Sequence, residues 1–169
     1  MPPLLFRNRY RVPSARLPGW DYRWPGTYAV TICVKDRVCC LGEVVEAEVA
    51  LSPIGAIVAS EWLAIPRAHP QVVLDEWVVM PDHLHGIVIF RGEEPPLPEE
   101  GLPAGSLGAV VGQFKQRATK RIRARWPGFA WQDRFFDQIL RDENGLERYR
   151  AYIRANPRRW RSSDSPATA

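Results

Sequence analysis

Two histidines, His83 and His85, stand two residues apart in the strand-like segment HLHGIVIF. Successive side chains of a β-strand point to opposite faces, so both imidazoles project from the same face. Such a pair can chelate one divalent cation, whereas a lone histidine on a strand usually has a structural role. Two imidazoles do not complete a metal site, so this interpretation requires a third ligand.

A second pair of polar residues, Tyr152 and Asn156, lies four residues apart in a segment with helical periodicity. This spacing places both side chains on one face of a helix. A phenolic hydroxyl can act as a nucleophile, and an amide oxygen can bind the same cation as the histidines. Tyr149 is the rival nucleophile. Because it lies between Leu146 and Ile153 on the apolar stripe, we interpret Tyr149 as a packing residue.

The segments around these pairs, VVMPDHLHGIVIF and RYRAYIRANPRRW, resemble the two motifs of single-tyrosine HUH nucleases. The similarity is greatest to the REP-associated tyrosine transposases and extends to the stretches RLPGWDYRWPGTYAVTICVKDR, SLGAVVGQFKQRATKRI and PGFAWQDRFFDQILRDE. It covers about residues 16–160. The resemblance implies that Tyr152 is the nucleophile and that His83, His85 and Asn156 are the metal ligands. Relatives outside this subgroup often have Gln in place of Asn156.

The resemblance also implies a substrate and a reaction. The family acts on single-stranded DNA hairpins of repetitive extragenic palindromes and cuts beside a short tetranucleotide. Attack by Tyr152 on phosphorus would leave a 5′-phosphotyrosine link and a free 3′-hydroxyl. Because the link retains the bond energy, a second hydroxyl can attack it and rejoin DNA strands without ATP. A divalent cation would polarise a non-bridging phosphate oxygen, and two imidazoles with one amide suit Mg²⁺ or Mn²⁺ better than a catalytic Zn²⁺.

The elements that position these residues predict an α+β fold. Hydrophobic periodicity, turn residues and helix caps indicate the order strand, hairpin, helix, strand, strand, helix, strand, helix. With the hairpin set aside, this order contains the ferredoxin-like split β-α-β unit, an antiparallel sheet with helices packed on it and a C-terminal helix that carries Tyr152. The expected strands are 27–34, 72–79, 83–90 and 135–141, the hairpin 38–50, and the helices 53–65, 106–126 and 143–155.

The length of 169 residues indicates one domain rather than two. We expect an extended basic arm over residues 1–26, a single transposase-like domain over 27–160 and a frayed tail over 161–169. The sequence contains no apolar stretch of the roughly 20 residues that a membrane span needs, which favours a cytoplasmic protein without a membrane partner. Three cysteines form neither a disulfide framework nor a zinc spacing.

Charge is distributed unevenly along the chain. Residues 26–112 hold 4 basic and 12 acidic side chains, whereas residues 113–161 hold 14 basic and 5 acidic ones. Arginines interleaved with aromatic residues suit a nucleic-acid surface, because guanidinium groups bind phosphates and aromatic rings stack on bases. The predicted DNA-contact residues are Arg7, Arg9, Arg11, Arg16, Lys115, Lys120, Arg121, Arg123, Arg158 and Arg159.

Two other functions are compatible with parts of this pattern. A non-catalytic ferredoxin-like module can bind single-stranded nucleic acid on an aromatic surface without any metal. A related HUH nuclease of replication initiation or plasmid mobilisation would share the same chemistry. The sequence also leaves open whether the protein is a monomer or a homodimer, and whether the helix of Tyr152 docks on its own sheet or on a partner's.

Overall fold

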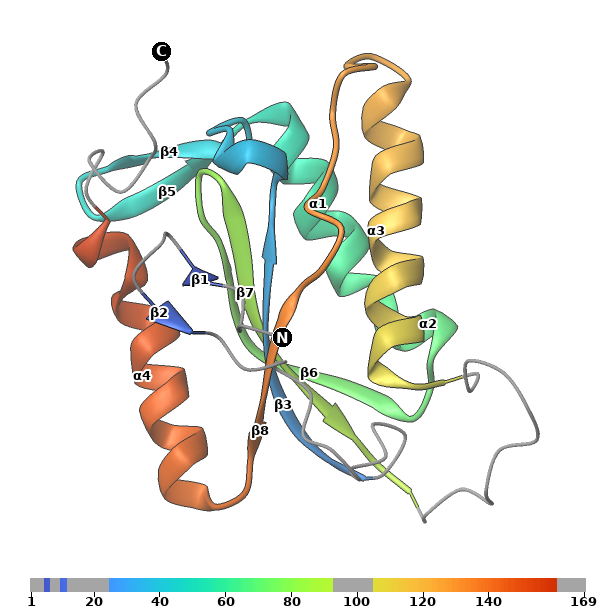
Figure 1. Cartoon of the computed structure of the whole chain (residues 1–169), viewed down its shortest axis with the longest axis vertical. Helices are drawn as coiled ribbons and strands as arrows, with labels where there is room; N and C mark the ends of the chain where they lie inside the picture. Colours follow the sequence, from blue (N-terminus) through green and yellow to red (C-terminus); the bar gives the residue numbers. More distant parts are fainter. Residues whose placement is uncertain (1–4, 7–9, 12–24, 93–104, 161–169) are drawn as a thin grey trace.

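The computed structural model describes residues 5–6, 10–11, 25–92 and 105–160 and centres on a four-stranded sheet (Figure 1). Its strands are β3 (Gly26–Cys33), β6 (Val72–Val79), β7 (His83–Phe90) and β8 (Phe136–Leu140). They lie in the order β6-β7-β3-β8, and every neighbouring pair is antiparallel. In the two central strands, Thr31 is the register partner of His85, and Cys33 is the partner of His83. This register sets the surroundings of both histidines.

Helices cover both faces of the sheet (Figure 1). They are α1 (Pro53–Leu63), α3 (Leu107–Arg123) and α4 (Glu143–Arg159). Leu84 of β7 belongs to the main core beneath α1 and α3, whereas Ile87 packs with Ile153 of α4 on the opposite face. Because side chains alternate along a strand, His83 and His85 share the face of Ile87. Both histidines therefore point toward α4.

The connections reproduce the split β-α-β topology. Helix α1 joins β3 to β6, and α3 joins β7 to β8, and in each case one antiparallel strand lies between the two parallel strands that are joined. This order is the ferredoxin-like arrangement, with α4 added on the face that the two crossover helices leave uncovered. The predicted fold class is confirmed.

Side-chain caps start the helices where the sequence predicted. The Ser52 hydroxyl accepts a hydrogen bond from the backbone N–H of Gly55 at 3.0 Å, and the Asp142 carboxylate accepts one from Gly145 at 2.6 Å. Each bond satisfies a backbone N–H that lacks a partner within its helix. The capping residues therefore mark the beginnings of α1 and α4 correctly.

The predicted end of the last helix was wrong. We expected it to stop near Asn156 because Pro157 disfavours helical backbone in the residue before it. Instead, α4 continues through Pro157 to Arg159. A proline in the last turn removes one backbone donor, while the N–H of Trp160 still bonds to the carbonyl of Asn156 at 3.0 Å. The extra turn leads to Trp160, whose ring lies near that of His83.

Short elements complete the described part of the chain. They are β1 (Leu5–Phe6), β2 (Tyr10–Arg11), the 3₁₀ turn η1 (Lys35–Arg37), β4 (Gly42–Val45), β5 (Glu48–Leu51) and α2 (Ile65–Ala68). Strands β1 and β2 pair antiparallel within the predicted arm, and β4 and β5 form the expected extra hairpin. The rest of the arm and the predicted tail at 161–169 lie outside the described residues. None of the helices described combines the length and apolarity needed to cross a membrane.

Candidate active site

The two histidines form a compact pair at the start of β7. Their ring centroids are 4.5 Å apart with an interplanar angle of 81°, and each residue is only 6% exposed. Strand alternation explains why the rings share a face, as the spacing predicted. The pair lies between the sheet and α4, where a ligand would have limited contact with solvent.

His85 is oriented by its register partner on β3. The Nδ1 atom of His85 and the Thr31 hydroxyl oxygen are 2.8 Å apart, and the Thr31 hydroxyl also hydrogen-bonds to Tyr149. When Nδ1 carries the ring proton, the Thr31 hydroxyl oxygen accepts it and Nε2 is left unprotonated. Burial, followed by the charges of His83 and Arg37, lowers the pKa of His85 to about 3. The ring is therefore neutral, and its Nε2 atom faces α4, 3.4 Å from the Tyr152 hydroxyl.

His83 is oriented by a buried carboxylate. Its Nδ1 lies 2.5 Å from Asp82 Oδ1, and the second Asp82 oxygen pairs with Arg37 Nε at 2.9 Å. Asp82 is 0% exposed. A carboxylate that holds one ring nitrogen leaves the other nitrogen available for a metal and strengthens its basicity. Sequence reasoning missed Asp82, Arg37 and Thr31 in this role, although Asp82 stands next to His83 in the motif.

Tyr152 and Tyr149 occupy different environments on α4. The Tyr152 hydroxyl lies 3.4 Å from His85 Nε2, and Tyr152 is 39% exposed. Tyr149 is half-buried against the smaller core, and burial raises the pKa of its phenol. A nucleophile must reach both the cation and a substrate, and this geometry favours Tyr152.

Asn156, the predicted third ligand, turns toward its own helix. Its amide nitrogen donates to the backbone carbonyl of Tyr152 at 2.9 Å. The Trp160 ring lies beside the histidines instead, with its centroid 6.1 Å from that of His83. Neither sequence motif indicated Trp160 at the site. Its proximity follows from the extra helical turn after Pro157.

The donor set at this site fits a divalent cation. Hydrogen bonds engage the Nδ1 atoms of both histidines, which leaves two Nε2 atoms as ligands. Within the described ranges, no group of three or more His, Cys, Asp or Glu residues is arranged to hold a metal. A complete protein site at His83 and His85 therefore needs a neutral oxygen such as the Asn156 amide, and substrate phosphate or water would fill the other positions.

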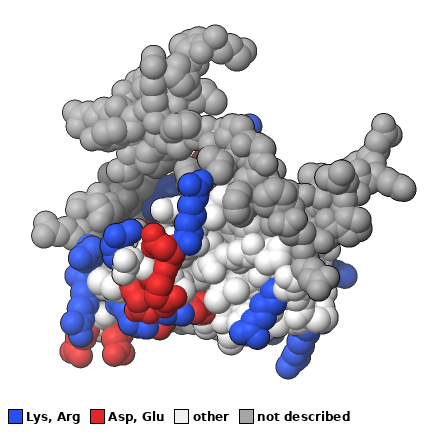
Figure 2. Space-filling model, turned by 90° about the horizontal axis from the view of Figure 1, so that it is seen from below, with Lys and Arg blue, Asp and Glu red and all other residues white. Residues whose placement is uncertain are grey.

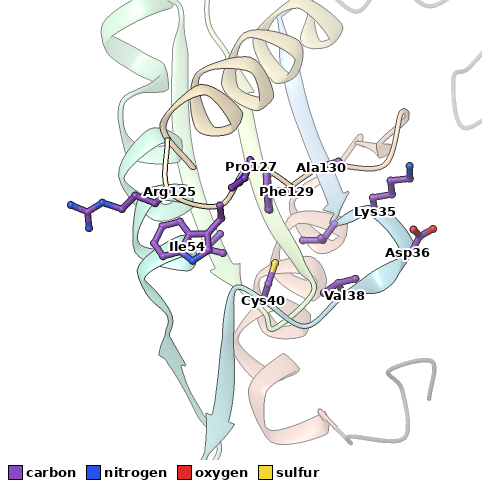
Figure 3. Close-up of a pocket in the computed structure, with 12 residues that line it drawn as sticks. Lys35, Asp36, Val38, Cys40, Ile54, Arg125, Pro127, Phe129 and Ala130 are labelled. Carbon is purple, nitrogen blue, oxygen red and sulfur yellow. The ribbon is translucent and has the colours of Figure 1, made fainter. Parts of the chain in front are cut away.

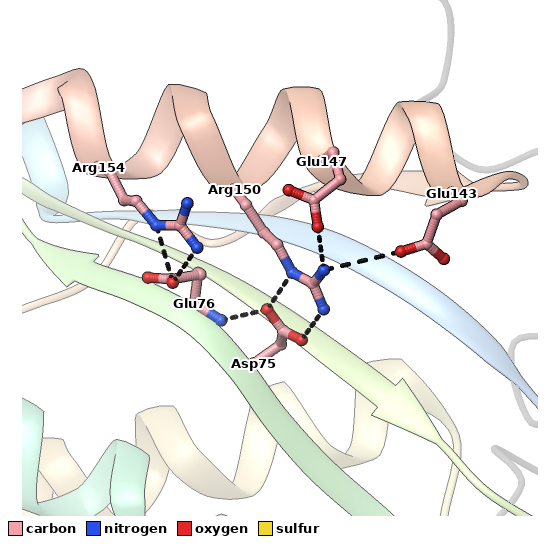
Figure 4. A network of polar contacts seen from close by, with 6 residues as sticks. All are labelled: Asp75, Glu76, Glu143, Glu147, Arg150 and Arg154. Atoms are coloured by element: carbon pink, nitrogen blue, oxygen red, sulfur yellow. Dashed lines mark hydrogen bonds and ion pairs between the residues drawn. The ribbon is translucent and has the colours of Figure 1, made fainter.

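Ion pairs hold α4 on the sheet of its own chain (Figure 4). Arg150 binds Asp75 of β6 through two bonds, Nε to Oδ1 at 2.8 Å and Nη2 to Oδ2 at 2.6 Å, and it also contacts Glu147. One turn further, Arg154 binds Glu76 with distances of 2.9 and 2.6 Å. Hydrogen bonds from Arg150 lower the pKa of Asp75. Seen from below, acidic and basic side chains lie next to one another (Figure 2).

Part of the predicted basic surface is engaged within the protein. Arg121 on α3 pairs with Glu61 of α1 at 2.7 Å, and Arg117 pairs with the same carboxylate at 3.2 Å. Glu61 is 7% exposed, so these arginines balance a buried charge between the two helices. Arg121 still has a half-exposed side chain.

Three other α3 cations surround a hollow. Lys115, Lys120 and Arg123 line a space of about 640 Å³ beside the loop that contains Gln132. Lys115 donates to the Gln132 carbonyl at 2.5 Å, and Arg123 Nε donates to that of Phe129 at 2.8 Å. Lys120 is exposed, and its ammonium has no hydrogen-bond partner or ion pair among the residues described. Three cations of α3 therefore line the hollow, together with Asp133.

The remaining predicted contacts fall at the two ends of the chain. Arg158 and Arg159 are exposed on the last turn of α4. Arg11 belongs to β2. Arg7, Arg9 and Arg16 lie outside the described residues.

Comparison with known proteins finds similarity both by sequence and by structure. An uncharacterized protein of Haemophilus influenzae is 34% identical over 160 residues, which cover 87% of this chain and 88% of the relative. The structure of a REP-associated tyrosine transposase bound to a REP hairpin superposes with a TM-score of 0.59 at 20% identity, covering 84% of this chain and 72% of that one. A candidate transposase of Deinococcus radiodurans has a TM-score of 0.50 at 16% identity, covering 82% and 94%. No family model matches the chain.

Proposed function

Because this chain belongs to one family with the uncharacterized Haemophilus influenzae protein and has the fold of the REP-associated tyrosine transposase, we propose that it is a transposase-like DNA strand transferase. It would cleave single-stranded DNA beside a palindromic hairpin through a 5′-phosphotyrosine intermediate. The solved transposase is bound to a REP hairpin, which supports a hairpin substrate.

The observation that carries this proposal is the position of one hydroxyl. Tyr152 Oη lies 3.4 Å from His85 Nε2, and the ring centroid of His85 lies 4.5 Å from that of His83. A tyrosine three residues away, Tyr149, is half-buried and bonded to Thr31 instead. This arrangement supports Tyr152 as the nucleophile, because its exposed phenol could meet a phosphate bound at the two histidines.

The proposed reaction conserves the phosphodiester bond energy in a covalent link. The Tyr152 oxygen attacks phosphorus and loses its proton to solvent, while the bond from phosphorus to O3′ breaks and O3′ takes up a proton. The chain holds the reacting groups in place, because Thr31 fixes His85 and Asp82 fixes His83. Mg²⁺ or Mn²⁺, when bound by the two histidines and the Asn156 amide, would supply positive charge for the phosphate oxygens.

The experiment is a covalent trapping assay. The protein is mixed with a labelled single-stranded DNA hairpin and Mn²⁺, and a denaturing gel is examined for a protein–DNA band. Wild type and Tyr149→Phe should form the band, while Tyr152→Phe should bind the hairpin without forming it. His85→Ala should also lose the band and largely retain hairpin affinity, because affinity depends on phosphate and base contacts made elsewhere.

Peptide mapping of the trapped adduct identifies the nucleophile directly. Attachment of DNA at Tyr149 would reverse the assignment. Cleavage by Tyr152→Phe without an adduct would replace the tyrosine mechanism with attack by water. Hairpin binding by the wild type without any cleavage, in Mg²⁺ and in Mn²⁺, would instead identify a non-catalytic binding module.

A further inference from the structure

A pocket of about 440 Å³ lies at the end of the sheet where β7 begins (Figure 3). Its walls are apolar and aromatic, with contributions from Ile54 of α1 and from Trp126 and Phe129 after α3. Val38, 54% exposed, lies at its edge. A mostly apolar concavity with aromatic walls is typical of a site for a flat ring. The active-site residues described above leave this pocket unused.

Cations flank this pocket. Lys35 and Arg125 lie on opposite sides of it, and Asp36 is next to Lys35 (Figure 3). Both cationic side chains are exposed, and neither is hydrogen-bonded or ion-paired to another residue in the described segments. With one carboxylate against two cations, the rim favours an anionic ligand.

The pocket and the active site share a wall. The backbone N–H of Val34, which lines the pocket, donates to the Asp82 carbonyl at 2.9 Å. Arg37, in the same turn, pairs with the Asp82 carboxylate that orients His83. A group bound in the pocket would therefore lie close along the chain to the residues that position the histidines.

The turn between the two sites has unusual backbone geometry. Asp36 and Arg37 have φ values of 55° and 56°, a left-handed conformation that non-glycine residues rarely adopt. Arg37 is held there by Asp82 and by a bond from its guanidinium to Cys33 Sγ at 2.7 Å. Such backbone strain concentrates at ligand-binding segments.

We propose that this pocket binds one unpaired nucleobase of the single-stranded DNA that flanks the cleavage site. The base would stack among Trp126, Phe129 and Val38, and the adjoining phosphates would contact Lys35 and Arg125. An aromatic wall accepts the face of any base, so the pocket adds affinity for unpaired nucleotides. This inference rests on the proposed function, because it assumes a single-stranded DNA substrate.

The test compares two DNA probes on the Tyr152→Phe background without metal, where cleavage cannot interfere. Both probes are the same hairpin. One carries a single-stranded flank of thymidines, and the other carries an abasic flank with the same phosphates. The parent protein should bind the thymidine probe about tenfold more tightly than the abasic probe, because one base stacks in the pocket. This affinity ratio between the two probes is the readout. Val38→Glu should reduce this ratio to near one.

Leu63→Glu is the matched control, since Leu63 is 56% exposed and does not line the pocket. It should keep the full ratio. The double variant Lys35→Gln/Arg125→Gln should weaken both probes equally and flatten the salt dependence, because it removes phosphate contacts alone.

The outcomes separate this inference from the proposed function. If Val38→Glu keeps the affinity ratio between the probes while the wild type forms the covalent adduct, the pocket does not bind the base. The proposed strand-transferase function is then unaffected. If Val38→Glu abolishes the ratio while the wild type never forms the adduct, the pocket is supported and the strand-transferase assignment is overturned. Equal binding of both probes by the parent protein would overturn the pocket directly.

Discussion

Arg150 of α4 and Asp75 of β6 face each other as a two-bond guanidinium–carboxylate pair, with N–O distances of 2.8 and 2.6 Å. The pair lies two residues before Tyr152 on the helix. It connects the tyrosine helix to the edge strand next to the histidine strand β7. A paired geometry of this kind fixes orientation as well as distance. The position of the Tyr152 hydroxyl over His85 therefore depends on a contact made elsewhere on α4.

The first prediction concerns this pair. Arg150→Gln should slow covalent adduct formation at saturating DNA by about tenfold or more, because a displacement of ~1 Å can cost about 100-fold. Hairpin affinity should change little. Arg148→Gln removes a cation from the same helix that has no ion pair among the described residues, and it should retain the parent rate. The charge swap Asp75→Arg/Arg150→Asp should restore part of the rate. An unchanged rate in Arg150→Gln would contradict the role of the pair.

The second prediction concerns acid stability. Hydrogen bonds from Arg150 lower the pKa of Asp75 below its ordinary value of 3.8, so the folded state favours the ionised carboxylate. The stabilisation is present above pH 3.8 and is lost as the pH falls through the lower folded pKa. In urea unfolding, the difference in the free energy of unfolding between wild type and Asp75→Asn should be constant near neutral pH. It should shrink as the pH falls below 3.8. Arg150→Gln should show the same convergence, and a difference that grows in acid would contradict the assignment.

The third prediction concerns the carboxylate behind His83. Asp82→Asn should weaken Mn²⁺ binding by about 10- to 100-fold, because it removes the partner that orients the ring and raises its basicity. The measurement is free Mn²⁺ by electron paramagnetic resonance, which does not depend on cleavage. Asp133→Asn, at an exposed aspartate outside this site, is the control. Equal affinity in Asp82→Asn, with metal still bound at His83, would show that Asp82 has only a structural role.

The fourth prediction concerns Gly86, between His85 and the main core. A Cβ at Gly86 would lie 2.3 Å from Cζ2 of the fully buried Trp62. Gly86→Ala should therefore destabilise the fold by about 1–3 kcal/mol through overpacking. At Gly112 on α3, an added Cβ would have no atom within 4 Å, so Gly112→Ala should stabilise the protein by up to about 1 kcal/mol. The midpoint temperature of thermal unfolding should fall in Gly86→Ala and rise in Gly112→Ala. Equal shifts in the two variants would contradict this account.

Much of the fold follows from local sequence signals. The strands at 72–79 and 83–90 have the predicted bounds, because an apolar run on each side of a short Met-Pro-Asp connection leaves few alternatives. The caps at Ser52 and Asp142 start helices for equally local reasons. The shared face of His83 and His85 requires only the two-residue period of a strand. The shared face of Tyr152 and Asn156 requires only the helical period.

Tertiary structure decided which residues meet across these elements. Thr31 contacts His85 because strand register places them opposite each other, and register depends on the packing of whole faces. Arg150 and Asp75 are 75 positions apart, and either could have paired with a nearer opposite charge. The same holds for Arg121 and Arg123, which the charge pattern assigned to DNA and the fold engages with Glu61 and with the Phe129 carbonyl.

The sequence by itself therefore determined the candidate reacting groups, since residue type and local period specify a histidine pair on a strand and a tyrosine on a helix. Only the tertiary structure decided that α4 docks on its own sheet, with Tyr152 at His85 rather than Tyr149. It also decided that the chain continues helically through Pro157 and brings Trp160 beside His83. The physical reason is that docking depends on burial and long-range ion pairing between distant segments, which no short-range periodicity encodes.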